Sequence, residues 1–385
     1  MGGAARTRRL YPQFMGTRFF RNSRTTDRCP RPGNRASRGS NQRAAACALY
    51  GLTLCSALLF AAGPLRAQLS HLGEPLQLTF TGQNAEAYWS PDGKRLIFQS
   101  TRDGAECDQI YIMDADGSHA HRVSSGRGRT TCGYFLPDNH HILYASTEAE
   151  GDACPPPADR GKGYVWAVYP SYDIYAANDD GSDAHRITTT PGYDAEATVN
   201  FATGRIVYTS MASHDLELWT MAADGSGKHR LTHSLGYDGG AVYSRDAKHI
   251  VWRANHPKTA ADTKQYKDLL AQGLTTPMKM ELFVADSDGA HARQITHFGC
   301  ASFAPTFTPD GKKILFASNK HHCDSSDFEL YLINLDGTGL EQITSYGGFT
   351  SFPEFSPDGK TLVFASNLHA RSHYEFNIFT ASWRQ

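Results

Sequence analysis

A four-residue turn of the form Ser-Pro-Asp-Gly returns along the chain, and it constrains the fold more than any other feature of the sequence. Three copies are complete and three are degenerate: Ser90–Gly93, Thr308–Gly311 and Ser356–Gly359, then Leu136–Asn139, Phe201–Gly204 and Ser244–Ala247. Proline pre-sets the first dihedral angle of such a turn, aspartate hydrogen-bonds to the turn backbone, and glycine accepts a positive φ. The sequence therefore predicts six tight hairpins.

Each turn is followed by a short apolar strand that ends in small or polar residues. These strands read LIFQS (96–100), ILYAS (142–146), IVYTS (206–210), IVWRA (250–254), ILFAS (314–318) and LVFAS (362–366). In five of the six units another strand then runs into a second turn ending in Asp-Gly, which is a strong hairpin signal. A brief closing strand follows, as in HRITT (185–189) and EQITS (341–345).

Six units of four short strands, at spacings of about 45 to 65 residues, predict an all-β fold: a six-bladed β-propeller of four-stranded antiparallel blades. The sixth unit has one more strand at 376–381 and then no closing strand of its own. Residues 76–81 (LQLTFT) match the closing-strand pattern of the other units. We therefore expect the N-terminal strand to complete the last blade and close the ring.

These motifs resemble the WD-like, PD40-type repeats of the TolB family of periplasmic β-propellers. The resemblance is carried by the Ser-Pro-Asp-Gly turn with its LIF or LVF strand, the Asp-x-Asp-Gly turn and the terminal Arg-x-Thr strand. It covers residues 74–385 and recurs six times. It implies a TolB-like propeller domain over 74–385 in an exported protein, without the N-terminal α/β domain that the family type carries ahead of its propeller.

Residues 1–67 differ in composition from the rest of the chain. Residues 1–43 contain eleven arginines, no lysine and one acid, and an apolar run follows at 44–62 with Gly63, Pro64 and Ala67 behind it. A basic flank, an apolar stretch, a helix breaker and a small residue are the parts of a secretory signal. We expect cleavage near Ala67 and a periplasmic or secreted protein; the alternative is an uncleaved membrane anchor, because the run is about long enough to span a bilayer.

The exported part is acidic. Removing residues 1–67 takes away twelve arginines and one aspartate and leaves 26 bases against 38 acids. Such a surface repels nucleic acid and anionic lipid, so nucleic acid is excluded as a partner and membrane contact is expected only through an uncleaved leader. We expect a monomer that binds a protein or peptide partner in the cell envelope.

Five cysteines remain in the exported part, and an oxidising compartment favours disulfides between them. Cys300 and Cys323 are predicted to pair, because no other cysteine lies near them in the sequence. Among Cys107, Cys132 and Cys154 the sequence leaves the pairing open.

Two long insertions interrupt the regular repeat, at residues 147–172 in the second unit and 256–280 in the fourth. The second contains a segment, AADTKQYKDLLAQGL, that predicts a short amphipathic helix. Long loops on a rigid scaffold commonly hold binding sites. Both insertions belong to the same face of a propeller, and we expect a protein or peptide to bind this decorated face.

Candidate binding residues come from the segments that lead into the innermost strands. They are Tyr193, Asp194, Glu196, Tyr237, Asp238, Arg253 and His256. Converging carboxylates at a channel mouth suit a cation or a basic peptide; alternatively, Asp194 and Asp238 cap their turns. Arg253 interrupts an apolar strand, so it pairs with such an acid or meets a ligand.

Histidines on the decorated face suggest a second interpretation. His256, His321 and His322 are weak candidates for binding a transition metal, with Cys323 as a soft ligand. This is the basis for an alternative function, a metal-assisted polysaccharide lyase or hydrolase. The chain shows no G-x-S-x-G, H-E-x-x-H, phosphate-binding glycine loop or dinucleotide fingerprint, so the sequence indicates no cofactor and favours a non-enzymatic binding or scaffold protein.

Overall fold

The computed structural model describes residues 71–372 and 375–384, and these residues form an all-β propeller of six four-stranded antiparallel blades. The leader that the sequence indicates, residues 1–67, lies outside the described residues. With the innermost strand first, the first blade contains β2 (Asn84–Trp89), β3 (Arg95–Ser100), β4 (Gln109–Asp114) and β5 (His121–Arg122), and the second contains β6 (Thr130–Phe135), β7 (His141–Ser146), β9 (Asp173–Asn178) and β10 (His185–Arg186). The third blade contains β11 (Asp194–Val199), β12 (Ile206–Ser210), β13 (Glu217–Met221) and β14 (His229–Arg230), and the fourth contains β15 (Tyr237–Tyr243), β16 (His249–Asn255), β18 (Glu281–Asp286) and β19 (Arg293–Gln294). The fifth blade contains β20 (Ser302–Phe307), β21 (Lys313–Ser318), β22 (Glu329–Asn334) and β23 (Glu341–Gln342), and the sixth contains β24 (Thr350–Phe355), β25 (Thr361–Ser366), β26 (Asn377–Ser382) and β1 (Leu76–Gln77). The predicted fold class is confirmed.

The Ser-Pro-Asp-Gly turns join the first and second strands of the blades, as their chemistry predicts. In the first blade the Ser90 hydroxyl donates to Asp92 over 2.7 Å and accepts from the Arg95 N–H over 2.9 Å. Gly93 has a φ of 71°, a conformation that a side chain would strain. The same hydroxyl-to-aspartate bond recurs at Ser244, Thr308 and Ser356.

A second contact explains the Arg-x-Thr pattern of the short outer strands. In each blade of the described chain, a Ser or Thr hydroxyl two residues after the outer strand accepts a hydrogen bond from a backbone N–H of the neighbouring strand. The pairs are Ser124 with Ile110, Thr188 with Ile174, Thr232 with Leu218, Thr296 with Leu282, Thr344 with Leu330 and Thr79 with Ile378. A two-residue strand has few ladder bonds, so this side-chain bond extends its attachment.

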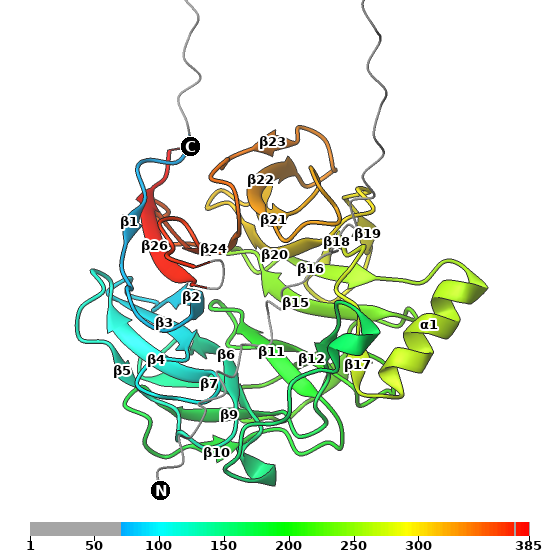
Figure 1. Cartoon of the computed structure of the whole chain (residues 1–385), viewed down its shortest axis with the longest axis horizontal. Helices are drawn as coiled ribbons and strands as arrows, with labels where there is room; N and C mark the ends of the chain where they lie inside the picture. The colour runs from blue at the N-terminus through cyan, green and yellow to red at the C-terminus, as the bar shows by residue number, and fades with distance from the viewer. Residues whose placement is uncertain (1–70, 373–374, 385) are drawn as a thin grey trace, which may run out of the picture. The chain divides into compact units, whose positions relative to one another are not determined.

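The sixth copy of this contact comes from the start of the described chain. β1 pairs antiparallel with β26, with Leu76 opposite Thr380 and Gln77 opposite Phe379. Thr79 then donates to Asn377 over 3.0 Å and accepts from the Ile378 N–H over 2.8 Å. Residues 76–79 therefore lie where the other blades have their own closing strand (Figure 1).

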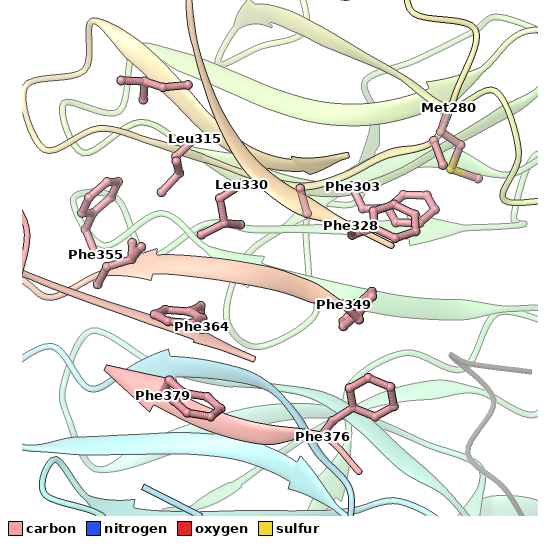
Figure 2. Close-up of a cluster of buried hydrophobic side chains, with 14 of the residues drawn as sticks. Met280, Phe303, Leu315, Phe328, Leu330, Phe349, Phe355, Phe364, Phe376 and Phe379 are labelled. Carbon is pink, nitrogen blue, oxygen red and sulfur yellow. The ribbon is translucent and has the colours of Figure 1, made fainter. Parts of the chain in front are cut away.

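Buried aromatic and aliphatic side chains fill the space between neighbouring blades. The largest cluster joins the fourth, fifth and sixth blades, and Figure 2 shows its phenylalanines in successive layers. Phe303 stacks on Phe328 with ring centroids 5.0 Å apart, and Phe349 meets Phe376 edge-on at 5.3 Å. Such pairs add to the burial of apolar area that holds blades together.

The second insertion contains the predicted helix, α1 (Ala260–Leu270), which the Thr259 hydroxyl caps by accepting from the Asp262 N–H. Disulfides join Cys300 to Cys323 and Cys107 to Cys154. The second of these ties the first insertion to the first blade, and Cys132 is left as a buried free thiol among the described residues. No helix in the described ranges is long and apolar enough to span a membrane.

Replacing Thr79 with valine is expected to lower the free energy of unfolding by about 1–3 kcal/mol, because the buried Ile378 N–H and the Asn377 amide lose their partner. Urea unfolding followed by tryptophan fluorescence measures this. Thr81→Val, at an exposed position three residues before β2, is the matched control and is expected to stay within about 0.5 kcal/mol of the parent protein. Equal losses in the two variants would contradict a role for the Thr79 contact.

Candidate functional site

Every innermost strand of the described propeller bulges at the same place. The strand register shifts between Ala85 and Tyr88 in the first blade, and equivalent shifts occur in the other five. One residue of each bulge has a positive φ, between 45° and 59°: Glu86, Cys132, Glu196, Gly240, Ala304 and Phe352. We call these six residues the bulge ring.

The bulge ring lines one end of an axial cavity of about 350 Å³. A bulge re-aims a side chain relative to the regular alternation of a strand, and all six ring residues border this cavity. From the ring the lining continues past Tyr88, Trp89 and Tyr134 to the hairpin turns at Pro91 and Pro357. The cavity is therefore aromatic in its middle and reaches the face that carries the Ser-Pro-Asp-Gly turns.

Glu196 and Arg253 form a buried ion pair beside this cavity. The Glu196 carboxylate accepts hydrogen bonds from Arg253, from the Tyr237 hydroxyl at 2.8 and 2.9 Å, and from Thr209 at 2.7 Å. Burial opposes the charge of Arg253, but Glu196 and the neighbouring groups together raise its pKa. Of the two roles that the sequence left open for Arg253, pairing with an acid is the one observed.

Two further carboxyl groups, those of Glu86 and Glu354, border the cavity, and burial raises the pKa of both. Burial raises the pKa of Glu86 to about 7, against a hydrogen bond with Cys132 that lowers it. Burial likewise raises the pKa of Glu354 to about 7, although its carboxylate accepts from the Trp89 N–H at 2.7 Å and the Tyr134 hydroxyl at 3.0 Å. Both groups therefore change charge close to neutral pH.

The opposite end of the axis is covered by the two insertions. β8 (Trp166–Ala167) from the first insertion pairs with β17 (Leu274–Thr275) from the second, and the Val168 N–H donates to the Gly273 carbonyl over 2.7 Å. The Arg253 guanidinium lies 5.4 Å from the centre of the Trp166 ring. A small space of about 40 Å³ lies beneath this cover, beside Tyr193 and Tyr237. The larger axial cavity lies on the turn side of the bulge ring.

The remaining predicted residues fall into separate places. Asp238, fully buried, accepts from the Trp252 indole at 2.6 Å and from His256 Nε2 at 3.0 Å, so its carboxylate does not cap a turn. Asp194 is buried in the first position of β11, and its burial raises its pKa to about 6. His256 borders a different cleft, beside α1.

The metal candidates are not brought together. His321 Nε2 lies 2.9 Å from the Gln342 amide oxygen, and Cys323 is in a disulfide. Over residues 71–372 and 375–384, no group of three or more His, Cys, Asp or Glu side chains is arranged to hold a metal ion.

Sequence reasoning missed Glu86, Cys132 and Glu354. A signal for them exists, because aligning the six innermost strands puts Glu86 and Cys132 at the same position as Glu196, and Glu354 two positions further along. The single strands gave no indication of the bulge that turns these side chains toward the axis.

Comparison with known families and structures agrees with this architecture. The TolB beta propeller domain model (PD40) matches residues 275–378. A TolB-type protein from Agrobacterium tumefaciens superposes with a TM-score of 0.53 at 18% identity, over 82% of this chain and 98% of that one. TolB from Acinetobacter baumannii superposes with a TM-score of 0.51 at 18% identity, over 80% of this chain. The match spans 65% of the Acinetobacter chain, just under two thirds of its length. Hydrazine synthase from Kuenenia stuttgartiensis superposes with a TM-score of 0.53 at 14% identity, over 72% of this chain and 41% of that one.

At these identities the structural matches show a shared fold alone, and no curated protein sequence matches the chain. The fold and the axial cavity define a six-bladed β-propeller. Within that class, residues 275–378 match the TolB beta propeller domain model.

Glu86→Gln is expected to remove part of the pH dependence of stability. Because the folded protein keeps Glu86 protonated up to about pH 7 while an ordinary glutamate loses its proton near 4.5, this group's contribution is complete below pH 4.5 and is lost as the pH rises to 7. The loss amounts to about 3 kcal/mol. Glutamine stays neutral and avoids it.

Urea unfolding at pH 5 and pH 8 tests this expectation. The difference in free energy of unfolding between the two pH values is expected to be smaller in Glu86→Gln than in the parent protein. Glu106→Gln, at an exposed position, is the control and should leave the difference unchanged. An unchanged difference in Glu86→Gln would show that Glu86 is not kept protonated by the fold.

Proposed function

We propose that this protein is an exported, TolB-like propeller that binds a protein or peptide partner in the cell envelope. The observation that carries the proposal is the axial cavity on the turn face, which combines aromatic walls with carboxyl groups at one end. A concave site with apolar walls and a few polar groups is the usual form of a binding pocket. The sequence pointed to the decorated face instead, but the insertions of that face pair with each other across the axis.

The rim of the cavity has the features of an anchor for a partner. Phe201 is 44% exposed and stacks on Tyr134 with centroids 5.8 Å apart. Exposed aromatic side chains at the edge of a pocket are frequent binding hot spots. Beside it, Arg245 reaches from the fourth blade to the sixth and donates to the Pro357 and Ser356 carbonyls at 2.8 and 2.5 Å, which holds the rim in shape.

The charge of the cavity favours a segment that is apolar or basic. Arg253 is neutralised by Glu196, whereas Glu86 and Glu354 gain negative charge as the pH rises through about 7. A lysine or arginine side chain that enters the cavity would stabilise the charged carboxylates and lower their pKa values. Export and a periplasmic or secreted location belong to the same proposal and rest on the composition of residues 1–67 and on the TolB-like repeat.

A photo-crosslinking residue in place of Phe201 is expected to capture a partner from envelope extract, because it stands at the cavity rim. Leu340 is another exposed apolar side chain, and it follows an outer turn away from the cavity. The same photo-crosslinking residue in place of Leu340 is therefore the control. Mass spectrometry of the crosslinked products measures the difference. Equal capture from positions 201 and 340, or capture from 340 alone, would overturn the proposed site.

The alternative function, a metal-assisted polysaccharide lyase or hydrolase on the decorated face, makes a different prediction. His256 is held by a buried carboxylate, as metal-binding histidines often are. The binding proposal expects purified protein to retain no stoichiometric transition metal after dialysis, measured by inductively coupled plasma mass spectrometry. His214, which is exposed in the third blade and does not border the cleft of His256, is the control. One metal per chain that disappears in His256→Ala, but not in His214→Ala, would favour the lyase.

A further inference from the structure

A second cleft, separate from the axial cavity, lies beside the second insertion. It has a volume of about 630 Å³ and is bordered by the end of β16, the first turns of α1 and the edge of β18. Figure 1 shows α1 projecting from this side of the fourth blade. None of the bulge-ring residues borders it, so it is independent of the proposed peptide site.

The fold holds one ring nitrogen of His256 and leaves the other accessible in this cleft. Its Nε2 lies 3.0 Å from both oxygens of Asp238, whose side chain is fully buried. The Phe283 ring contacts the imidazole with centroids 4.9 Å apart. Across the described residues Nδ1 has no hydrogen-bond partner, and it is not a buried atom. The fold therefore orients the ring by one nitrogen and leaves the other to solvent or a ligand.

Charged side chains of both signs border the cleft beside His256. Lys258 and Lys279 border the cleft, are exposed, and make no ion pair with any residue that the structure describes. Two acids also border the cleft, and neutral donors bind both of them: Asp262 accepts from the Thr259 hydroxyl at 2.8 Å, and Glu281 accepts from Thr296 and from the Gly299 N–H.

Two acids behind the cleft act on His256 from the third blade. Asp215 accepts from the Tyr266 hydroxyl at 2.5 Å, and Glu217 pairs with Arg230. Burial opposes a charge on His256, but Asp238, Glu217 and Asp215 together raise its pKa, with Asp238 contributing most of the increase. Protonated His256 has an Nδ1–H to donate, and the two lysines of the cleft are then available to the same ligand.

We propose that this cleft binds an anionic group, a carboxylate or a phosphate, which accepts a hydrogen bond from His256 Nδ1 between Lys258 and Lys279. The N-terminal turn of α1 adds a positive end of a helix dipole to the same cleft. The Phe283 ring offers apolar contact to the rest of such a ligand. The chemistry fits a small acidic molecule that carries either group.

The test is titration of the purified protein with inorganic phosphate and, separately, with citrate, while the His256 ring protons are followed by NMR. Both anions are expected to shift the His256 signals at pH 6, and the affinity is expected to fall as the pH rises through the His256 pKa, because the protonated ring is the form that donates. Response to one anion alone would identify which of the two groups the cleft accepts. His256→Gln assigns the signals.

Matched double variants separate this cleft from general surface charge. Lys258→Ala with Lys279→Ala is expected to weaken anion binding about five-fold or more, since two unpaired charges are lost. Lys312→Ala with Lys360→Ala removes two exposed lysines from the turn face and should leave the affinity unchanged. No shift of the His256 signals at pH 6, or equal weakening in the two double variants, would overturn the proposal.

Discussion

Convergence of six strands on one axis is the constraint on which the rest of the site depends. Each innermost strand contains a bulge where it lies beside this axis. One residue of each bulge adopts a left-handed backbone conformation that only glycine accepts freely. Gly240 fits this requirement, whereas the other five ring residues accept a strain of about 1 kcal/mol or more each. Because the bulge places one residue per blade at the cavity, the identities of these six residues determine the chemistry of its inner end.

Burial then separates the carboxyl groups of this end into two kinds. Glu196 forms a buried ion pair with Arg253 and accepts a hydrogen bond from the Tyr237 hydroxyl. Burial raises the pKa of Glu86 and of Glu354 to about 7, and neither forms an ion pair with any residue that the structure describes. A buried ion pair contributes little net stability, and its effect here is to cancel the positive charge that would otherwise oppose a basic ligand.

The two insertions decide which end of the axis is open. Their pairing through β8 and β17 covers the bulge ring on one side, with Trp166 against Arg253 and Phe303. The same second insertion, through α1 and Lys279, forms the wall of the cleft that contains His256. One segment thus closes the axial site on one face and creates a separate polar site beside it.

Short-range chemistry in the sequence determined the six hairpins, the count of blades and the closing strands, because proline, aspartate and glycine specify turns within four residues and the closing Thr bonds to the adjacent strand. It also singled out Glu196, Tyr237 and Arg253 as candidate binding residues, but not the contacts among the three. It did not determine Glu86, Cys132 or Glu354, because strict alternation along a strand does not predict a bulge. Only the tertiary structure decided that the insertions at 147–172 and 256–280 meet, that Asp238 binds His256, and that the axial cavity reaches the turn face, since these contacts join blades whose spacing around the axis is set by packing of the whole ring.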